Sequence, residues 1–317
     1  MRSILNQRKN NIAAIILIMI TWLFAASCEN KNYKGTALDS ATEGVINISV
    51  DESYQPVIDE QVKMFESTYP GAKINVHYKT EADCFKDLLK DSATRMIIAT
   101  RGLNPKEEDY FKNNFGYVPI WNDVASDAIV VVVNGKSNDT LFTKERLKQQ
   151  LSGALGKKQT FVFDGLNATS IVRFAVDSIL NGNKFDSSIV KAVKGSKEVL
   201  EYVASDENAV GFVGISWIGN PEDSAQVNML KKIKMAYVRC DHCTDSPYVK
   251  PTQLGILTKR YPLVRGLYYI VKEQNAGLGT GFISFLKNER GQLIFRRAYL
   301  GHKMSFAIRG VTINEKL

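Results

Sequence analysis

Histidine is scarce in this chain of 317 residues, and the few histidines form no motif for hydrolytic chemistry. His77, His242 and His302 stand far apart, and the sequence contains no H-E-x-x-H, the two-histidine zinc motif of metalloproteases. The segment G-I-S-W-I-G (residues 214–219) misses the G-x-S-x-G spacing of a hydrolase nucleophile. An exported hydrolase is therefore the weakest of three functional hypotheses, and we predict no catalytic residue and no enzymatic activity.

Cysteine is almost as rare, with four residues in the whole chain. Cys240 and Cys243 form the segment C-D-H-C, but no second Cys or His pair lies nearby to complete the four ligands of a structural zinc site. A disulfide in a loop, or a pair of free thiols, is favoured over a metal, and Cys84 is then left over. We predict neither a metal nor a cofactor.

Blocks of basic residues are also missing, although the formal net charge is +8. Binding to nucleic acid normally requires clustered lysines and arginines, often interleaved with aromatic residues. We therefore expect no nucleic-acid partner. The positive charge remains compatible with small anionic ligands.

The longest apolar run near the start, residues 12–24, is shorter than the ~20 residues that span a bilayer. Three basic residues precede it, and residues 1–27 therefore read as an export signal whose loss would lower the net charge from +8 to +5. The run ends in A-A-S-C, which resembles the lipobox of bacterial lipoproteins, with Cys28 as the lipid-bearing residue. An ordinary signal peptide and an uncleaved anchor are the alternatives. Residues 28–43 are expected to be a flexible tether to a bacterial membrane, facing the periplasm or the cell exterior.

Beyond residue 43, strand and helix patterns alternate, which indicates an α/β fold with mixed sheets. Strands are expected at 45–50, 73–78, 95–100, 121–135, 160–163, 203–218 and on both sides of Tyr261-Pro262 within 252–271. Helices are expected at 56–69, 80–89, 141–153, 172–180, 186–193, 196–204, 280–288 and 290–299, and after Asn104. No internal repeat or low-complexity tract is present.

The stretch 163–180 has the local chemistry of an anion site. A strand-like segment ends at Phe163, Asn167 offers a capping oxygen, and apolar residues then recur at helical spacing. The start of such a helix presents unpaired backbone N–H groups and the positive end of its dipole, beside the hydroxyls of Thr169 and Ser170. Ser53 and Tyr54 occupy a second strand-to-helix junction of this kind. Helix capping alone is the alternative explanation at both places.

Several segments, in order along the chain, resemble the phosphate-binding proteins of bacterial ABC transporters. These segments are D-A-I-V-V-V-V-N followed by L-F-T-K-E-R-L-K-Q-Q-L-S-G, then A-V-G-F-V-G, Y-P-L-V-R-G-L-Y-Y-I, and F-I-S-F-L followed by G-Q-L-I-F-R-R-A-Y-L. The resemblance implies a two-lobed periplasmic-binding-protein fold (type II), in which each lobe is a mixed sheet flanked by helices and two segments cross between the lobes. It places lobe 1 at residues 44–130 and 250–317 and lobe 2 at residues 131–249.

The resemblance also implies the ligand contacts. By its motifs they are Ser53, Tyr54, Thr80, Thr100, Arg101, Asn167, Ala168 and Thr169. Phe163 stands where the family has an arginine, so Arg101 is expected to supply the guanidinium, with Arg173 as a second candidate. Ala168 replaces the glycine of the family's S-G-T signature.

The preferred hypothesis is thus a monomeric, lipid-anchored protein that captures inorganic phosphate or another oxyanion between its lobes for the membrane permease of an ABC importer. The second hypothesis keeps the fold but assigns it a sensor or scaffold role, with another small ligand or a protein partner. The altered loop at Asn167 and Ala168 motivates it.

Overall fold

A computed structural model describes residues 39–156, 159–245 and 247–306 of the chain. The predicted export signal, most of the tether and Cys28 lie outside these residues. Among the described residues, no helix has the length and apolar character needed to cross a membrane. The described residues all belong to one compact unit, which begins at Asp39.

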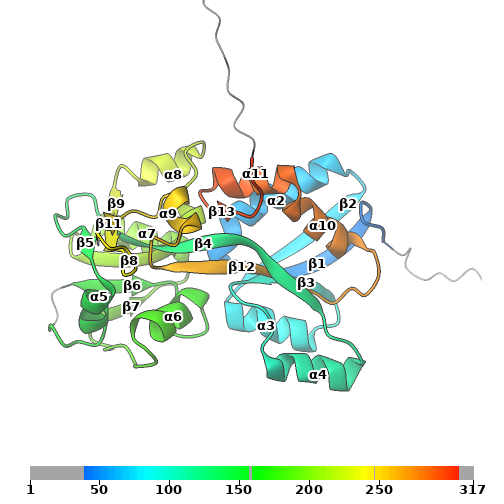
Figure 1. Ribbon diagram of the computed structural model, residues 1–317, viewed down its shortest axis with the longest axis horizontal. Helices are drawn as coiled ribbons and strands as arrows, with labels where there is room; N and C mark the ends of the chain where they lie inside the picture. The colour runs from blue at the N-terminus through cyan, green and yellow to red at the C-terminus, as the bar shows by residue number, and fades with distance from the viewer. Residues whose placement is uncertain (1–38, 157–158, 246, 307–317) are drawn as a thin grey trace, which may run out of the picture. The chain divides into compact units, whose positions relative to one another are not determined.

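The first lobe is built around parallel strands that each lead into a helix, as the alternating pattern predicts (Figure 1). Strand β1 pairs in parallel with β2 on one side and with β3 on the other. The elements are β1 (Gly44–Asp51), η2 (Glu52–Tyr54), α2 (Gln55–Thr68), β2 (Ala72–Lys79), α3 (Glu81–Lys90), β3 (Thr94–Ala99) and α4 (Pro105–Phe115). The chain returns to this lobe with β12 (Val264–Val271), α10 (Leu278–Lys287), α11 (Glu289–Arg297) and β13 (Gly301–His302).

Strand β4 (Ile120–Asn134) connects the two lobes. Its first half pairs with β12 as far as Ala128, and from Ile129 onward it pairs with β8 of the second lobe. Figure 1 shows β4 and β12 running side by side across the middle of the described unit. The continuous apolar run in β4 is explained by this position, because nearly all of residues 124–134 are buried.

The second lobe contains the remaining strands of the sheet, whose order is β2-β1-β3-β12-β4-β8-β6-β7. β13 and β9 also pair with β4, and β11-β10-β5 form a separate sheet. The elements are β5 (Leu141–Phe142), α5 (Lys144–Leu151), β6 (Thr160–Phe163), α6 (Ser170–Phe174), η3 (Ala175–Ile179), β7 (Val190–Ala192), α7 (Ser196–Ser205), β8 (Ala209–Gly214), η4 (Ile215–Trp217), α8 (Ser224–Met229), β9 (Ile233–Met235), β10 (Tyr237–Arg239) and β11 (Tyr248–Val249). Helix α9 (Gln253–Leu257) follows as the chain returns to the first lobe, where Gln253 donates to the carbonyls of Arg296 and Leu300.

Two element predictions are wrong. The helix expected at 186–193 is a turn followed by β7, because Val190 pairs with Phe161 at the edge of the sheet. The strand expected before Tyr261 is the short helix α9, which Thr252 caps by accepting the N–H of Gly255. Local apolar character did not distinguish strand from helix in either segment.

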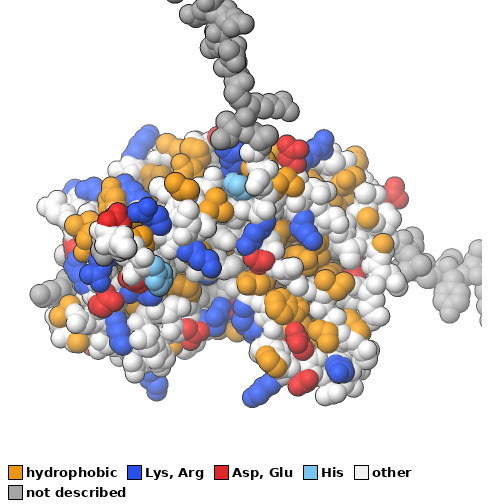
Figure 2. All heavy atoms as spheres, viewed as in Figure 1, with side chains coloured by type: hydrophobic (Ala, Val, Ile, Leu, Met, Phe, Trp, Pro, Cys, Tyr) orange, Lys and Arg blue, Asp and Glu red, His pale blue; other side chains and the backbone are white. Residues whose placement is uncertain are grey.

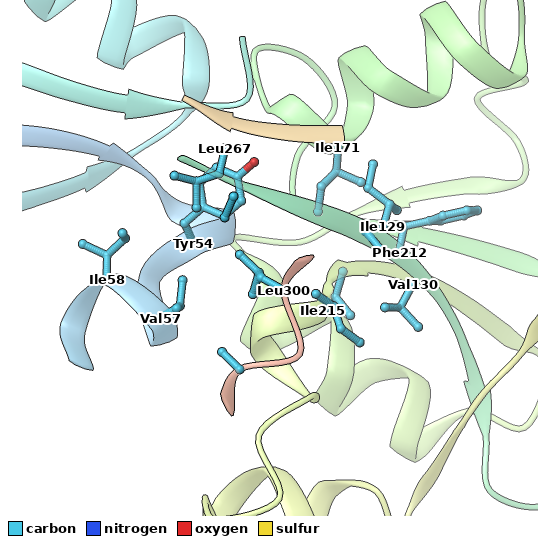
Figure 3. Close-up of a cluster of buried hydrophobic side chains, with 14 of the residues drawn as sticks. Tyr54, Val57, Ile58, Ile129, Val130, Ile171, Phe212, Ile215, Leu267 and Leu300 are labelled. Atoms are coloured by element: carbon cyan, nitrogen blue, oxygen red, sulfur yellow. The ribbon is translucent and has the colours of Figure 1, made fainter. Parts of the chain in front are cut away.

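A single hydrophobic cluster passes through the junction of the lobes. Figure 3 shows Tyr54 and Leu267 near Ile129 and Ile171, so side chains of both lobes share this core. A smaller cluster lies between α3, β3 and α4 and contains Cys84, which is buried and unbridged. Cys240 and Cys243 form a disulfide, as one of the two favoured alternatives predicted.

Candidate functional site

A cavity of about 270 Å³ lies where four strand-to-helix junctions of the two lobes meet. Lobe 1 contributes the ends of β1 and β2, and lobe 2 contributes the ends of β6 and β7. The lining residues are Asp51, Glu52, Tyr78, Lys79, Thr80, Asp83, Asp164, Thr169, Lys194 and Gly195. The face of the unit drawn in Figure 2 is hollowed at its lower edge, between the surfaces over α6 and over α3 and α4.

The inner wall of the cavity is acidic. Asp51 is 2% exposed, and its Oδ1 accepts hydrogen bonds from the backbone N–H (2.9 Å) and the hydroxyl (2.7 Å) of Ser53. Its other oxygen, Oδ2, is buried without a hydrogen-bond partner among the described residues. Asp164 is 8% exposed, and its Oδ1 accepts the hydroxyl of Thr169 at 2.8 Å.

Burial dominates the electrostatics of this wall. It raises the pKa of Asp164 to about 7, although the Thr169 hydroxyl acts in the opposite direction. Burial also raises the pKa of Asp51, and the positive charge of Arg265 offsets only part of that effect. The pKa of Glu52 is raised for the same reason, against the hydrogen bonds that Ser196 donates to it.

Behind the wall, Arg265 of β12 joins groups from both lobes. Its guanidinium is buried and donates to Asp127 Oδ2 at 2.7 Å, to Ser170 Oγ at 2.8 Å and to Ser53 Oγ at 2.8 Å. Since Ser53 precedes α2 and Ser170 begins α6, this one side chain fixes the two helix starts relative to each other. Buried arginines of this kind are retained only when such partners satisfy their N–H groups.

A second arginine bridges the lobes directly. Arg173 of α6 donates from Nε to Glu81 Oε2 at 2.6 Å and from Nη2 to Thr100 Oγ1 at 2.7 Å. Glu81 also accepts the backbone N–H of Thr100 at 3.0 Å. Burial acts to raise the pKa of Glu81, but the hydrogen bonds from Arg173 and Thr100 outweigh it, so the pKa is lowered.

Two further contacts join the lobes near the cavity. The carboxylate of Glu52 accepts the backbone N–H and the hydroxyl of Ser196, both at 2.9 Å, at the start of α7. The backbone N–H of Ala82 donates to the carbonyl of Ala168 at 3.1 Å. The structure therefore shows the lobes in contact through several of the protein's own polar groups.

The cations of the cavity lie farther out than its acidic wall. The Lys79 side chain is 39% exposed and pairs with Asp87 at 2.7 Å. Lys194, immediately before Gly195, is exposed and has no ion pair among the described residues. The wall of the cavity is thus acidic and buried. The rim carries Lys194, whose charge is unpaired among the described residues, together with Lys79, which is paired with Asp87, and the exposed Asp83.

Seven of the eight predicted ligand residues fall into three groups, and Arg101 is described separately below. Thr80 and Thr169 line the cavity, and each also caps a helix. Ser53, Tyr54 and Thr100 are buried beside it, with Tyr54 directing its hydroxyl to the Gly266 carbonyl at 2.7 Å. Asn167 and Ala168 are exposed and outside the lining.

Two structural details differ from the sequence-based expectations. The cap of α6 is Thr169, not Asn167, and Ala168 adopts a left-handed backbone with φ 70°. Arg101 lies outside the cavity lining, because its guanidinium pairs with Glu107 at 2.8 and 2.9 Å and stacks on the ring of Phe85. Among the described residues, the arginines that lie beside the cavity and could supply a guanidinium in place of Arg101 are Arg173 and Arg265.

Sequence reasoning missed Asp51, Asp164, Lys194 and Arg265. The first two end β1 and β6, so the rule that ligands bind beyond strand ends could have found them. Lys194 likewise lies just beyond β7, but the sequence pattern predicts a helix at residues 186–193 instead of this strand. Arg265 lies inside an antiparallel strand, where the local sequence carries no signal for a function.

Comparison with known proteins supports the predicted two-lobed fold. A family model described as "PBP superfamily domain" matches residues 35–290. The solved structure of a putative phosphate ABC transporter substrate-binding protein from Clostridium perfringens, with bound phosphate, is similar at TM-score 0.66 and 17% identity, covering 82% of this chain and 100% of that one. An ABC-type phosphate transport receptor from Vibrio cholerae is similar at TM-score 0.57 and 19% identity, covering 82% of this chain and 100% of that one.

A possible phosphate binding protein from Planctomyces limnophilus is similar at TM-score 0.54 and 19% identity, covering 82% of this chain and 93% of that one. No curated protein matches the chain. At these identities the structural likeness shows the fold alone, and the predicted α/β, two-lobed fold class is confirmed.

Proposed function

This chain belongs to the PBP superfamily, and we propose that it is a solute-binding protein that captures inorganic phosphate or a similar oxyanion in the interlobe cavity. The observation that supports this most is the convergence of helix starts from both lobes on one cavity. Helices α3 and α7, each ten residues long, begin at the cavity with Thr80 and Gly195. Helix N-termini favour anions through their free N–H groups and their dipoles.

The cations of the rim supply the remaining attraction. Lys194 is exposed and has no ion pair within the described chain, so its ammonium can meet an incoming anion without first breaking a salt bridge. Thr80 of the first lobe and Thr169 of the second also line the cavity, where their hydroxyls donate to Asp83 and Asp164. Arg173 and Arg265 contribute positive charge from behind the wall, although each is already paired with a carboxylate.

The proposal extends to the protein's place in the cell. A lipid on Cys28 would tether a monomeric receptor outside the cytoplasmic membrane, where the loaded form would deliver its ligand to the permease of an ABC importer. The solved relatives support this by their descriptions, since they are a putative transporter substrate-binding protein and a transport receptor. Under this proposal the protein binds and releases its ligand unchanged and is not an enzyme. The division into lobes at residues 130 and 250 is likewise a proposal, which the change of partner along β4 supports.

A thermal-unfolding panel with phosphate, sulfate, arsenate, molybdate and citrate tests the proposed function. A ligand that binds only the folded protein stabilises it by ~2.7 kcal/mol at a concentration of 100 times its Kd, and this raises the melting temperature. We expect a clear shift with at least one oxyanion. The Lys194→Gln variant should reduce the shift, and the matched control Lys287→Gln, an exposed lysine at the end of α10, should retain it. A panel with no shift at millimolar anion would exclude oxyanion capture.

A sensor or scaffold role remains the second candidate, and one observation favours it. Donors that would otherwise meet an anion are bonded to the protein's own carboxylates, namely the N–H of Ser53 to Asp51 and that of Ser196 to Glu52. A protein with this role would give no thermal shift with the anions but would bind a protein partner through its closed form.

A further inference from the structure

The cavity combines a buried wall of carboxyl groups with the exposed ammonium of Lys194 at its rim, and this arrangement restricts the ligand beyond what an oxyanion site requires. Four carboxyl groups and two ammonium groups line it. Asp51 and Asp164 are almost fully buried, whereas Lys194 is exposed and Lys79 is partly exposed. A bare dianion entering this cavity would approach the carboxylates of the inner wall.

The strongest indication is the Oδ2 atom of Asp51. It is buried and meets no hydrogen-bond donor within the described part of the chain, while Oδ1 of the same carboxylate accepts two hydrogen bonds from Ser53. A buried, unsatisfied carboxylate oxygen is costly, and a donor from a ligand would remove that cost. Arg265 does not supply this donor, because its guanidinium is bonded to Asp127, Ser53 and Ser170.

The other carboxylates of the cavity differ in how many hydrogen bonds they already accept from the protein. Asp164 accepts one hydrogen bond, from Thr169, and Glu52 accepts two from Ser196. Asp83, the fourth carboxylate, lies at the exposed rim and accepts the Thr80 hydroxyl at 2.8 Å. The uncommitted negative charge is therefore concentrated at the inner wall, near Asp51 and Asp164.

We propose that the ligand is a small zwitterion that carries an ammonium group together with a phosphate or phosphonate group. The ammonium faces Asp51 and Asp164 at the inner wall, and the oxyanion faces Lys194 and the start of α7 at the rim. The volume of about 270 Å³ suits this size, since it lies just below the roughly 300–1,000 Å³ of ordinary small-molecule pockets. This inference rests on the proposed function and specifies the class of ligand.

The raised pKa values of the wall agree with this assignment. Burial raises the pKa of Asp51 and Asp164, which means that both carboxylates lack sufficient positive charge around them. An ammonium group placed between them would supply that charge through charge-assisted hydrogen bonds.

Calorimetric titration of the purified protein with four probes tests the inference. Phosphoethanolamine and ethyl phosphate form the central pair, because they differ only by the ammonium group, and inorganic phosphate and ethanolamine complete the set. We expect phosphoethanolamine to bind about ten- to hundredfold more tightly than ethyl phosphate, the range that one or two charge-assisted hydrogen bonds provide. Ethanolamine alone should bind more weakly than phosphoethanolamine.

Variants locate the two ends of the ligand. Asp164→Asn preserves an acceptor for Thr169 and should weaken phosphoethanolamine by about tenfold or more without weakening ethyl phosphate. Lys194→Gln should weaken both phosphate-bearing probes. The control Asp109→Asn removes an exposed carboxylate of α4 outside the cavity and should change neither. Thermal unfolding of each variant confirms that it is folded.

The outcomes separate the inference from the proposed function. If ethyl phosphate or inorganic phosphate binds as tightly as phosphoethanolamine, the zwitterion is wrong and oxyanion capture stands. If none of the phosphate-bearing probes binds, the zwitterion and phosphate capture are both wrong, and a shift with another anion of the thermal-unfolding panel is then needed to sustain oxyanion capture. If ethanolamine binds as tightly as phosphoethanolamine, the phosphate group is not recognised and the zwitterion is wrong.

Discussion

The sharpest test of the acidic wall is the replacement of Asp164 by Asn. Asp164 is buried, its Oδ1 accepts the Thr169 hydroxyl at 2.8 Å, and its pKa is raised from 3.8 to about 7 by burial. Between pH 4 and pH 7 the unfolded chain therefore releases a proton that the folded chain retains. The free energy of unfolding must fall as the pH rises through this window.

The size of the effect follows from the two pKa values. With 3.8 for the unfolded chain and about 7 for the folded chain, the linkage relation gives a loss of ~3 kcal/mol from Asp164 between pH 4.5 and pH 7.5. For a chain of this size, ~1 kcal/mol corresponds to roughly 2–4 °C in melting temperature. The Asn variant lacks the ionisation, so it should avoid a loss of roughly 6–12 °C over the same interval.

The assay is thermal unfolding of the wild type and the Asp164→Asn variant at pH 4.5 and pH 7.5, without added ligand. For each protein, the change in melting temperature between pH 4.5 and pH 7.5 is measured, and the two changes are then compared. The comparison is needed because Asp51 and Glu52 titrate in both proteins. We expect the variant to gain stability relative to the wild type as the pH rises. Equal pH dependence in the two proteins would refute the raised pKa, and a larger loss in the variant would refute the sign of the argument.

Three further predictions concern other parts of the described chain. Arg265→Met should lower the free energy of unfolding by about 3–5 kcal/mol, because it leaves Asp127 buried without its guanidinium partner, and urea unfolding measures the loss. A smaller loss, about 2 kcal/mol, is expected when Cys240 and Cys243 are both changed to Ser, since their disulfide closes only a short loop; melting under oxidising conditions should show it. Ala168→Gly should raise stability by about 0.5–1 kcal/mol because Ala168 has φ 70°, and an unchanged or lower melting temperature would contradict this.

The elements that could be predicted are those whose local sequence pattern is compatible with only one type of secondary structure. The apolar run of β4 is long and bounded by polar turns, and Pro56 and Pro105 mark helix starts where a missing N–H costs nothing. The segments that failed, 186–193 and 252–260, are short, and their apolar residues follow neither a clear strand period nor a clear helix period. Their structure is decided by a partner strand and by a Thr cap, which a local pattern does not reveal.

The candidate site was predictable only where it coincides with strand ends. Thr169 was predicted from its hydroxyl at a helix start and from the family resemblance, whereas Thr80 was predicted from the resemblance alone; both line the cavity and cap helices. The destination of a long side chain is a different problem, because Arg101 could have turned either to the cavity or to Glu107. The structure shows the second arrangement, in which Asn104 and Glu107 form a capping box that also holds the guanidinium.

The polar bridges between the lobes bear on how tightly any ligand can bind. In a two-lobed receptor that closes only around its ligand, part of the binding free energy is spent on moving the closed state from a minor to a major population. Here Glu81 holds Arg173, and Glu52 holds Ser196, so protein groups alone stabilise contact between the lobes. Under the proposed function, a ligand that fits the cavity would need to supply less free energy for closure, and its affinity would depend mainly on how well it satisfies Asp51, Asp164 and Lys194. We therefore expect the choice between ligands to be determined more by their contacts with the cavity wall than by the free energy of lobe closure.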